Sequence, residues 1–450
     1  MKISTVILAA GKGTRMRSKR PKVLHELLGK PLISYSIETA KQVTGLKPVV
    51  IVGYEADAVR EVIGDQVDYV QQVPQLGTGH AVQQIEALLR EQADLILVLA
   101  ADMPLLTSDS LKRLVTLQET SGGPITITTF FSQEPRGFGR VVRDAFGDVR
   151  EIVEQLHATP EILAIRELNA GVYCFDAKWL WEALPRIPLS PRGEYYLTDL
   201  VGIAVEDGLP INTFRLEDAD EAMGINTRIH LAQAESLLRR KINHKWMLEG
   251  VTLVDPQSTY IEAKVKIGMD TIVHPNTYLL GNTTIGDDCL IGPNAIVSDT
   301  RIGDRCKVFN SVLESAILED DVDIGPFGHL RKGAHLAEGV HMGNFGEVKN
   351  SYLGAGTKMG HFSYLGDATV GEGVNIGAGT ITCNYDGVQK HPTEIGAGAF
   401  IGSDTMLVAP LKVGEKARTG AGSVVTKEVP PKTVVAGVPA RAIRKIEEDD

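Results

Sequence analysis

Near the start of the chain, the residues best suited to chemistry surround a glycine-rich segment. The apolar run Ile3–Ala10 leads into Gly11–Thr14, and the basic residues Arg15 and Lys22 follow. The spacing fits neither the dinucleotide motif, which needs a third glycine, nor the P-loop, which needs Gly-Lys-Ser/Thr after four spacer residues. Backbone N–H groups on a turn at a helix N-terminus, with cations beside them, suit a triphosphate. The alternative is an ordinary turn with solvated basic residues.

Asp102 comes two residues after the end of the fully apolar run Leu95–Ala100. An aspartate at such a position is either a helix cap or a metal ligand, and capping is the commoner role. Here Pro104 and the more suitable cap Ser108 stand between Asp102 and the next predicted helix. We therefore expect Asp102 to bind Mg²⁺, which prefers carboxylate oxygens and phosphates.

A second group of polar residues lies in the C-terminal half of the chain. Arg331 and Lys349 are eighteen residues apart, so the repeat described below stacks one above the other, and two stacked cations favour an anion such as a sugar phosphate. His361 lies near Tyr364 and Asn375 in the same repeat. Imidazole ionises near neutral pH and suits a general base, although a histidine on a repeat surface is more often simply solvated.

The elements that must position the first group alternate between buried strands and helices. The predicted strands are Ile3–Ala10, Pro48–Gly53, Asp68–Gln72, Leu95–Ala100 and Ile125–Phe131, and the predicted helices are Leu32–Val43, Thr78–Glu91 and Ser108–Thr120. This order predicts a Rossmann-like α/β domain with helices on both faces of an open sheet. Ligands of such sheets bind at the carboxyl ends of the strands. Polar and glycine residues occupy turns there: Gln72, Gly77, Thr78, Gly139, Glu154, Asn169 and Asn226.

The second group belongs to a six-residue repeat that begins near Val251 and is clearest over Ile395–Val425. An apolar residue recurs at every sixth position and is usually followed by glycine. This period fits neither a helix nor an ordinary strand. It predicts a left-handed parallel β-helix of roughly ten coils, with the apolar residue inside and the glycine letting the backbone turn the corner. The repeat is irregular over Asp299–Val322.

These patterns divide the chain into residues 1–226, a linker helix over 227–250, and a repeat domain over 251–450. The polar segment Thr382–Glu394 stands between two regular repeats. We expect it to project as a loop, and such loops commonly carry function.

Composition restricts the class of protein. The net charge of −11 argues against a nucleic-acid-binding surface. The four cysteines have no metal-binding spacing, which indicates reduced thiols. The N-terminus lacks the features of a signal peptide, and no apolar run approaches the ~20 residues of a membrane span. A cytoplasmic enzyme without a membrane partner is expected.

With these motifs in place, residues 1–226 resemble the sugar-1-phosphate nucleotidyltransferases. The whole chain to about Lys427 resembles the bacterial bifunctional enzymes that acetylate glucosamine-1-phosphate and then uridylylate the product. The resemblance implies that UTP is held by Leu8, Ala9, Ala10, Gly11 and Lys22. It implies that Gln72, Gly77 and Thr78 read uracil, that Asp102 and Asn226 bind Mg²⁺, and that Gly139, Glu154 and Asn169 hold the amino sugar. Lys22 and Arg15 would offset charge that develops on pyrophosphate. Ala100-Ala101 replaces an aromatic-glycine pair that is frequent in the family.

For the repeat domain, the same resemblance implies that His361 is the general base. It assigns Arg331, Lys349, Tyr364 and Asn375 to glucosamine-1-phosphate, and Ala378, Ser403 and Ala421 to acetyl-CoA. Asn384 would contact the sugar phosphate or acetyl-CoA, and Tyr385 would lie beside the coenzyme. A backbone N–H near Ala378 or Ser403 would stabilise the oxyanion. The segment Val435–Arg441 departs from family members that carry an arginine near Gly437, and Arg441 is the candidate to replace it.

The expected function is therefore synthesis of UDP-N-acetylglucosamine for the cell wall, in a homotrimer, as the family implies. One alternative is a pyrophosphorylase for another sugar with a purely structural repeat domain. A non-enzymatic assembly subunit is a further alternative, but such a protein is expected to lack Lys22 and Asp102.

Overall fold

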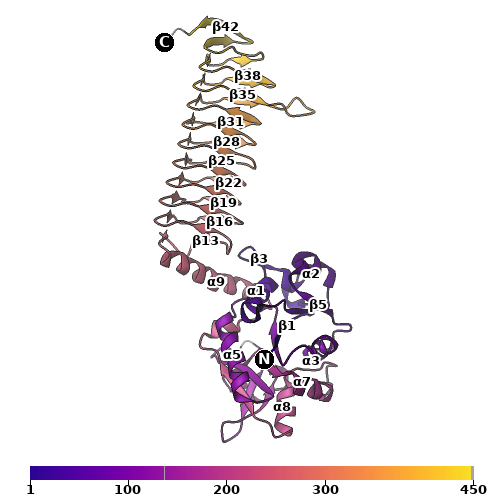
Figure 1. The fold of residues 1–450 in the computed structure, drawn as a ribbon. Helices are drawn as coiled ribbons and strands as arrows, with labels where there is room; N and C mark the ends of the chain where they lie inside the picture. The colour runs from indigo at the N-terminus through magenta and orange to yellow at the C-terminus, as the bar shows by residue number, and fades with distance from the viewer. Residues whose placement is uncertain (136, 447–450) are drawn as a thin grey trace. The chain divides into compact units, whose positions relative to one another are not determined.

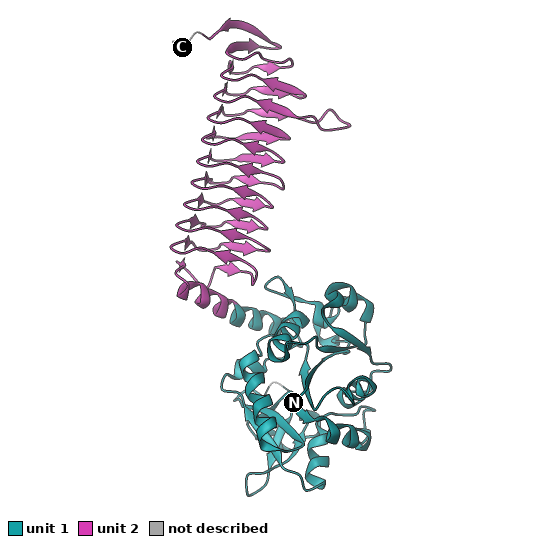
Figure 2. Ribbon diagram, in the orientation of Figure 1, with its two compact units in different colours: residues 1–238 teal, residues 239–450 magenta. Residues whose placement is uncertain are grey.

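The computed structural model describes residues 1–135 and 137–446. The chain divides into unit 1, Met1–Leu238, and unit 2, Arg239–Asp450, which meet inside helix α9 (Arg228–Leu248) (Figure 2). Ala234 of α9 packs into a core of unit 1, and Trp246 packs into the core of unit 2. The division at residues 226 and 250 stays a prediction.

Unit 1 is built on a mixed sheet whose main strands follow the order β11-β7-β10-β6-β1-β4-β5 (Figure 1). Strands β1, β4, β5 and β6 are parallel, as the sequence predicts. Strand β10 runs antiparallel to both β6 and β7, which the sequence does not predict. The strands of this sheet and its extension are β1 (Ile3–Ala9), β4 (Val49–Val52), β5 (Asp68–Gln71), β6 (Leu95–Ala100), β7 (Ile125–Phe131), β8 (Arg140–Arg143), β9 (Val149–Val153), β10 (Glu167–Asp176) and β11 (Ile211–Arg215).

Helices cover both faces of the sheet because successive strand residues point to opposite sides. In β1, Ile7 packs with the core that contains α1, α2 and α5, whereas Val6 packs with the core that contains α3, α7 and α8. The helices of unit 1 other than α9 are α1 (Leu32–Thr44), α2 (Ala56–Ile63), α3 (Thr78–Gln83), α4 (Glu86–Leu89), α5 (Ser108–Ser121), α6 (Pro160–Leu163), α7 (Ala177–Ala183) and α8 (Asp199–Glu206). A short hairpin of β2 (Glu26–Leu27) and β3 (Lys30–Pro31) precedes α1.

The helix predicted over Thr78–Glu91 is divided into α3 and α4. The backbone N–H groups of Gln84 and Ile85 bond to carbonyls three residues back, at Ala81 and Val82, and this tighter turn interrupts the α-helix.

Unit 2 is a left-handed parallel β-helix with three faces, each a ladder of short strands (Figure 1). The inward residues are buried and form one continuous core from Val251 to Val435. The first face contains β12 (Thr252–Leu253), β15 (Ile272–Val273), β18 (Leu290–Ile291), β21 (Lys307–Val308), β24 (Asp323–Ile324), β27 (His341–Met342), β30 (Lys358–Met359), β33 (Asn375–Ile376), β36 (Phe400–Ile401), β39 (Arg418–Thr419), β41 (Thr433–Gly437) and β42 (Ala440–Lys445).

The other two faces are ladders of the same kind. The second face contains β13 (Tyr260–Ile261), β16 (Tyr278–Leu280), β19 (Ile296–Ser298), β22 (Val312–Glu314), β25 (His329–Leu330), β28 (Gly346–Lys349), β31 (Ser363–Gly366), β34 (Ile381–Cys383), β37 (Met406–Val408) and β40 (Val424–Val425). The third face contains β14 (Lys266–Ile267), β17 (Thr284–Ile285), β20 (Arg301–Ile302), β23 (Ile317–Leu318), β26 (His335–Leu336), β29 (Tyr352–Leu353), β32 (Ala368–Val370), β35 (Thr393–Ile395) and β38 (Leu411–Val413).

The irregular stretch Asp299–Val322 keeps the ladder intact. Val297 pairs with Leu313 on the second face, and Ile302 pairs with Leu318 on the third. Shorter coils therefore preserve the inward positions, since the corners absorb the missing residues. At the last described coil, β42 turns back and pairs antiparallel with β41.

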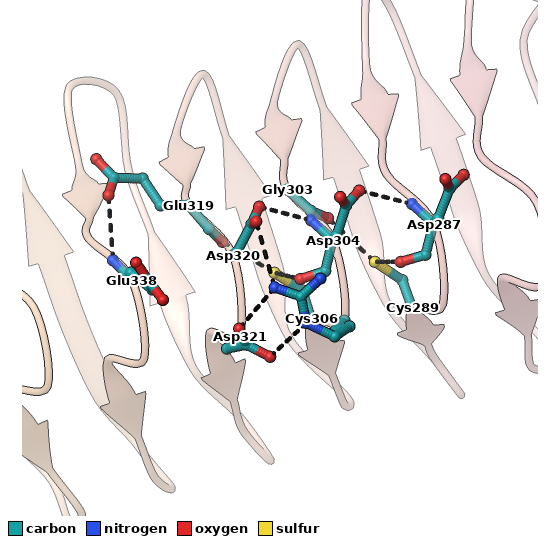
Figure 3. A network of polar contacts seen from close by, with 10 residues as sticks. Asp287, Cys289, Gly303, Asp304, Cys306, Glu319, Asp320, Asp321 and Glu338 are labelled. Atoms are coloured by element: carbon teal, nitrogen blue, oxygen red, sulfur yellow. Dashed lines mark hydrogen bonds and ion pairs between the residues drawn. The ribbon is translucent and has the colours of Figure 1, made fainter.

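Two glycines that directly follow inward residues, Gly286 and Gly303, are needed for a different reason from the predicted one. Gly286 and Gly303 have no positive φ, but a Cβ on either would collide with the carboxylate of Asp304 or Asp320 on the next coil. Figure 3 shows these aspartates at successive corners, where Asp304 accepts a hydrogen bond from the backbone N–H of Asp287, at 2.9 Å. Glycine is required because adjacent coils approach closely, and the acidic ladder satisfies corner N–H groups.

Two further global features bear on the predicted class. The cysteines Cys174, Cys289, Cys306 and Cys383 are all free thiols. None of the described helices combines the length and apolar composition that a membrane span requires.

Candidate functional site

Unit 1 has two adjoining cavities at the carboxyl ends of its central strands. The larger, of about 900 Å³, is lined by the glycine-rich segment, Lys22, Gln72 and Asp102. The smaller, of about 300 Å³, is lined by Gly139, Glu154, Asn169 and Asn226. Both are bounded by the same five residues: Leu8, Arg15, Thr78, Ala100 and Asp102. The residues predicted for the nucleotide and for the sugar therefore occupy neighbouring cavities.

An ion pair between Lys22 and Asp102 lies where the two cavities meet. The Lys22 ammonium donates to Asp102 Oδ2 at 2.5 Å and to Asn226 Oδ1 at 3.1 Å. The Ile225 backbone N–H donates to the Asp102 carbonyl at 2.9 Å, which fixes the Asn226 loop beside Asp102. The start of α9 supports the same loop, since the Asn226 N–H donates to His230 Nδ1.

The glycine-rich segment differs from the predicted helix N-terminus. It leads into a single 3₁₀ turn, Thr14–Met16, which ends at Arg17 in the left-handed region. So short a turn has little helix dipole, so a phosphate bound there would depend on local N–H groups and on the predicted cations Lys22 and Arg15. Gly13 has φ 60°, and a Cβ there would lie 2.5 Å from Lys22 Cβ, so the glycine allows the segment to pack against the lysine stem.

The residues predicted to read uracil form one connected turn. Gln72 is buried, and its side-chain amide donates to the Gly77 carbonyl at 2.9 Å. Thr78 Oγ1 accepts from the Leu197 N–H at 3.0 Å. Gly77 has φ 95°, and a Cβ there would lie 2.5 Å from the Tyr195 carbonyl oxygen. The turn is therefore held from both sides at the edge of the larger cavity.

Of the predicted sugar residues, Gly139 directly precedes β8, Glu154 directly follows β9, and Asn169 lies within β10 where its register shifts. Asn169 donates from its side chain to the Tyr173 hydroxyl at 2.7 Å, and its backbone N–H donates to the Gly139 carbonyl. Burial raises the pKa of the Glu154 carboxyl, partly offset by a hydrogen bond from Thr198. Glu154 is therefore more readily protonated than an exposed glutamate.

In unit 2 the predicted cations are stacked on neighbouring coils of the second face. Leu330 pairs with Val348, which places Arg331 next to Lys349. Arg331 donates to Glu347 at 2.9 Å. Contact with Lys390 and the charge of Arg331 lower the pKa of the Lys349 ammonium. Three cations therefore gather at this place.

Lys390 belongs to the projecting loop between β34 and β35, visible in Figure 1, and sequence reasoning missed it. The loop is ordered by an isolated antiparallel bridge between Tyr385 and Lys390. Asp386 accepts from the N–H groups of Val388 and Gln389 and pairs with His391 at 2.7 Å. Lys390 lies in an insert that does not follow the six-residue period, so its spacing in the sequence does not indicate which coil residue it contacts. Only the path of the loop in the structure shows that it lies beside Lys349.

Tyr364 lies on the coil next to Lys349, and Asn384 follows β34 on the coil after that. A Cβ on Gly366 would overlap the Tyr364 hydroxyl and lie 2.7 Å from Asn384 Nδ2, so both side chains meet above this glycine. Asn384 also donates to Asp367 Oδ2 at 2.6 Å. The structure thus places Asn384 beside Tyr364, one of the residues predicted for the sugar phosphate.

His361 begins a column of corner residues between the first and second faces. The ladder pairs Lys358 with Asn375, Ile376 with Ile401, and Ile401 with Thr419. This register aligns four predicted site residues at successive corners: His361, Ala378, Ser403 and Ala421. Within the described part of the chain, the backbone N–H groups of Ala378 and Ser403 make no hydrogen bond, as an oxyanion donor requires.

Two predicted residues lie apart from this group. Asn375 is on the first face, whereas Arg331, Lys349 and Tyr364 belong to the second. Arg441 is exposed on β42, where its guanidinium donates to the Ala440 carbonyl at 3.0 Å.

Comparison with known families agrees with this two-part structure. Residues 5–168 match a MobA-like NTP transferase domain. Residues 264–299 and 282–315 match the bacterial transferase hexapeptide model of six repeats, and residues 392–427 match the hexapeptide repeat of succinyl-transferase.

Three relatives match almost the whole chain. The chain is 46% identical to the bifunctional protein GlmU of Heliobacterium modesticaldum, over 95% of this chain and 94% of that protein. It is 44% identical to the bifunctional protein GlmU of Latilactobacillus sakei, over 96% and 94% of the two chains. It is 45% identical to the bifunctional protein GlmU of Pelobacter propionicus, over 95% of this chain and 94% of that protein. This chain therefore belongs to the family of bifunctional GlmU proteins.

Proposed function

We propose that this chain catalyses two successive steps of UDP-N-acetylglucosamine synthesis. Unit 2 acetylates glucosamine-1-phosphate with acetyl-CoA, and unit 1 transfers UMP from UTP to the N-acetylglucosamine-1-phosphate, releasing pyrophosphate. The observation that carries the proposal is that one chain of the GlmU family contains both Asp102 and Asn226 converging on an ammonium group between two cavities and, in unit 2, a corner column that includes His361 together with a cluster of three cations. We assign the first reaction to residues 251–450 and the second to residues 1–226.

In unit 1, Asp102 and Asn226 fit a divalent cation because their side-chain oxygens already converge on a cationic group. Among the described residues no three acidic, histidine or cysteine side chains gather as a metal cluster, so phosphate and water would supply the other ligands, as is usual for Mg²⁺. When bound, Mg²⁺ would neutralise the phosphates that must approach one another.

The chain's own residues position the two anions. A phosphate oxygen of the sugar attacks the α-phosphorus of UTP, and the bond to the leaving pyrophosphate breaks. Leu8, Ala9, Ala10 and Gly11 border the triphosphate, and Lys22 and Arg15 offset charge on the leaving group. Gln72, Gly77 and Thr78 hold uracil, while Gly139, Glu154 and Asn169 hold the sugar.

In unit 2, His361 takes a proton from the amine of glucosamine-1-phosphate, and the amine nitrogen attacks the thioester carbonyl. The unbonded N–H groups at Ala378 and Ser403 support an oxyanion site there. The C–S bond then breaks, and coenzyme A leaves as a thiol. Arg331, Lys349 and Lys390 hold the phosphate together with Tyr364 and Asn384, whereas Ser403, Ala421, Tyr385 and Arg441 border the coenzyme.

The acetyl site also supports a homotrimer. Asn375 lies on a different face from Arg331, Lys349 and Tyr364, so a ligand that contacts all four requires a second column beside the first. We propose that each acetyl site forms between two copies of unit 2. The cytoplasmic location stays a prediction.

A single incubation tests the function. Glucosamine-1-phosphate, acetyl-CoA, UTP and Mg²⁺ should together yield free thiol, pyrophosphate and a product with the mass of UDP-N-acetylglucosamine. Omitting acetyl-CoA should stop the sequence, and N-acetylglucosamine-1-phosphate should restore it. Pyrophosphate release with glucose-1-phosphate but without any thiol release would instead favour a different pyrophosphorylase with a structural repeat domain.

A further inference from the structure

The ion pair at the centre of unit 1 occupies the place where a divalent ion would bind. The Lys22 ammonium contacts the oxygens of both Asp102 and Asn226, and the side chains of Lys22 and Asp102 are each 15% exposed. A partly buried carboxylate without a cation is costly, because its charge is desolvated and unpaired. In the nucleotide-free protein Lys22 supplies that cation.

Lys22 also borders the cavity predicted for the triphosphate. Its stem packs against Gly13, where the Cβ-to-Cβ approach leaves no room for a larger residue. Only the outer part of the side chain is therefore free to change direction. A lysine is suited to this, because its ammonium sits on a flexible four-carbon stem.

We propose that Lys22 has two alternative partners. In the free protein its ammonium fills the cation site of Asp102 and Asn226, and it moves to the triphosphate when a divalent ion takes that site. This inference rests on the proposed uridylyltransferase function and adds a coupling between metal and nucleotide.

The consequence is a competition that can be measured without catalysis. Lys22 weakens metal binding in the free protein because the ion must displace the ammonium. A bound triphosphate draws the Lys22 ammonium away from Asp102 and Asn226, so the metal binds more tightly. By thermodynamic reciprocity, the bound metal also increases the affinity for the nucleotide. Charge-assisted hydrogen bonds contribute about 1.5–3 kcal/mol, which corresponds to about tenfold or more in affinity.

The test is a titration of the nucleotide-free full chain with Mn²⁺, followed by the electron paramagnetic resonance of the free ion. Lys22→Met should bind Mn²⁺ about tenfold or more tightly than the wild type. Lys22→Arg, which keeps the charge, should stay close to the wild type. Lys12→Met is the matched control, because it removes a lysine from the same segment that has no contact with Asp102 or Asn226, and its affinity should not change. Lys22→Gln serves as the second neutral variant if Lys22→Met folds poorly.

Asp102→Asn separates failure of this inference from failure of the proposed site. One outcome is that Asp102→Asn abolishes Mn²⁺ binding in the wild type and in the Lys22 variants, while Lys22→Met and Lys22→Gln bind Mn²⁺ no more tightly than the wild type. That outcome supports the metal site and refutes the exchange of partners by Lys22. If Asp102→Asn has no effect on Mn²⁺ binding, both the metal site and the exchange are refuted.

Discussion

The two sites of this protein are assembled in opposite ways. In unit 1, Lys22, Asp102 and Asn226 come from segments far apart in the sequence and meet only because loops fold across one edge of the sheet. In unit 2, His361, Ala378, Ser403 and Ala421 recur at the same corner of successive coils, because the strand register of the ladder aligns them. In the first site, individual loop contacts determine where the site residues lie. In the second site, the strand register of the β-helix determines it.

This difference means that the two sites should respond independently to substitution. The hydrogen bond from the Ile225 N–H to the Asp102 carbonyl lies entirely within unit 1. The corner column, in turn, has a continuous apolar core behind it, with Met359, Ile376 and Ile401 all buried. The predictions below test that independence.

The largest effect is expected for Asp102→Asn. Loss of the carboxylate should lower UTP-dependent pyrophosphate release on the order of 10³-fold, because several kcal/mol of charge stabilisation are lost. Acetyl transfer, measured by thiol release, should be unchanged. Asp109→Asn, an exposed acid in the first turn of α5, is the control and should preserve both activities. Comparable losses in the two activities of Asp102→Asn would contradict the independence of the sites.

His361→Asn should produce the reverse pattern. Without the general base, acetyl transfer should fall by about 10²-fold or more, while pyrophosphate release remains normal. His335→Asn changes a histidine on the third face, where it pairs with Glu319, and should leave acetyl transfer intact. An acetyl transfer rate that survives in His361→Asn would refute the assignment of the base.

A smaller effect is expected for Gly366→Ala. The added Cβ would displace the Tyr364 hydroxyl and press on Asn384. Loss of one hydrogen bond to the ligand should raise KM for glucosamine-1-phosphate by about tenfold, with a lesser change in kcat. Gly360→Ala, whose Cβ would meet no atom nearer than 4.0 Å, should not change KM. If both variants raise KM equally, crowding of Tyr364 is not the cause.

The smallest effect concerns pH. The pKa of Lys349 is lowered by contact with Lys390 and by the charge of Arg331, so Lys349 loses its proton below the usual lysine value of about 10.4. The cluster is fully charged below the lowered pKa, and affinity for glucosamine-1-phosphate should decrease a few-fold as pH rises through it. Removing Lys390 removes part of the repulsion, so Lys390→Ala should move this decrease to higher pH, although it also weakens binding. Binding titrations across alkaline pH would measure both curves, and coincident midpoints would exclude the coupling.

Sequence reasoning succeeded where spacing alone determines position. The stacking of Arg331 and Lys349 follows from the length of one coil, and the ladder confirms it. The strands of unit 1 were also predictable, because buried strands have continuous apolar runs. The antiparallel direction of β10 was not, since direction depends on how the chain returns to the sheet.

Other features depend on contacts that no local pattern records. The meeting of Lys22 with Asp102 and Asn226 depends on a backbone hydrogen bond between distant loops. Lys390 reaches Lys349 because the Tyr385–Lys390 bridge shapes its loop. For Gly286 and Gly303 the restriction comes from the neighbouring coil rather than from the residue's own backbone angles, whereas Gly292 and Gly325 have φ 87° and 107° and fit the predicted role at a turn.

The reversal of β42 against β41 has a consequence for the behaviour of the protein in concentrated solution. An open ladder of parallel strands would present unpaired N–H and C=O groups on which another chain could assemble into fibres. Here the last strand of the described ladder runs in the opposite direction and carries the exposed basic side chains of Arg441, Arg444 and Lys445. Their mutual repulsion and the antiparallel direction discourage end-to-end growth. The same strand that provides a candidate coenzyme ligand thus also protects the protein from polymerisation.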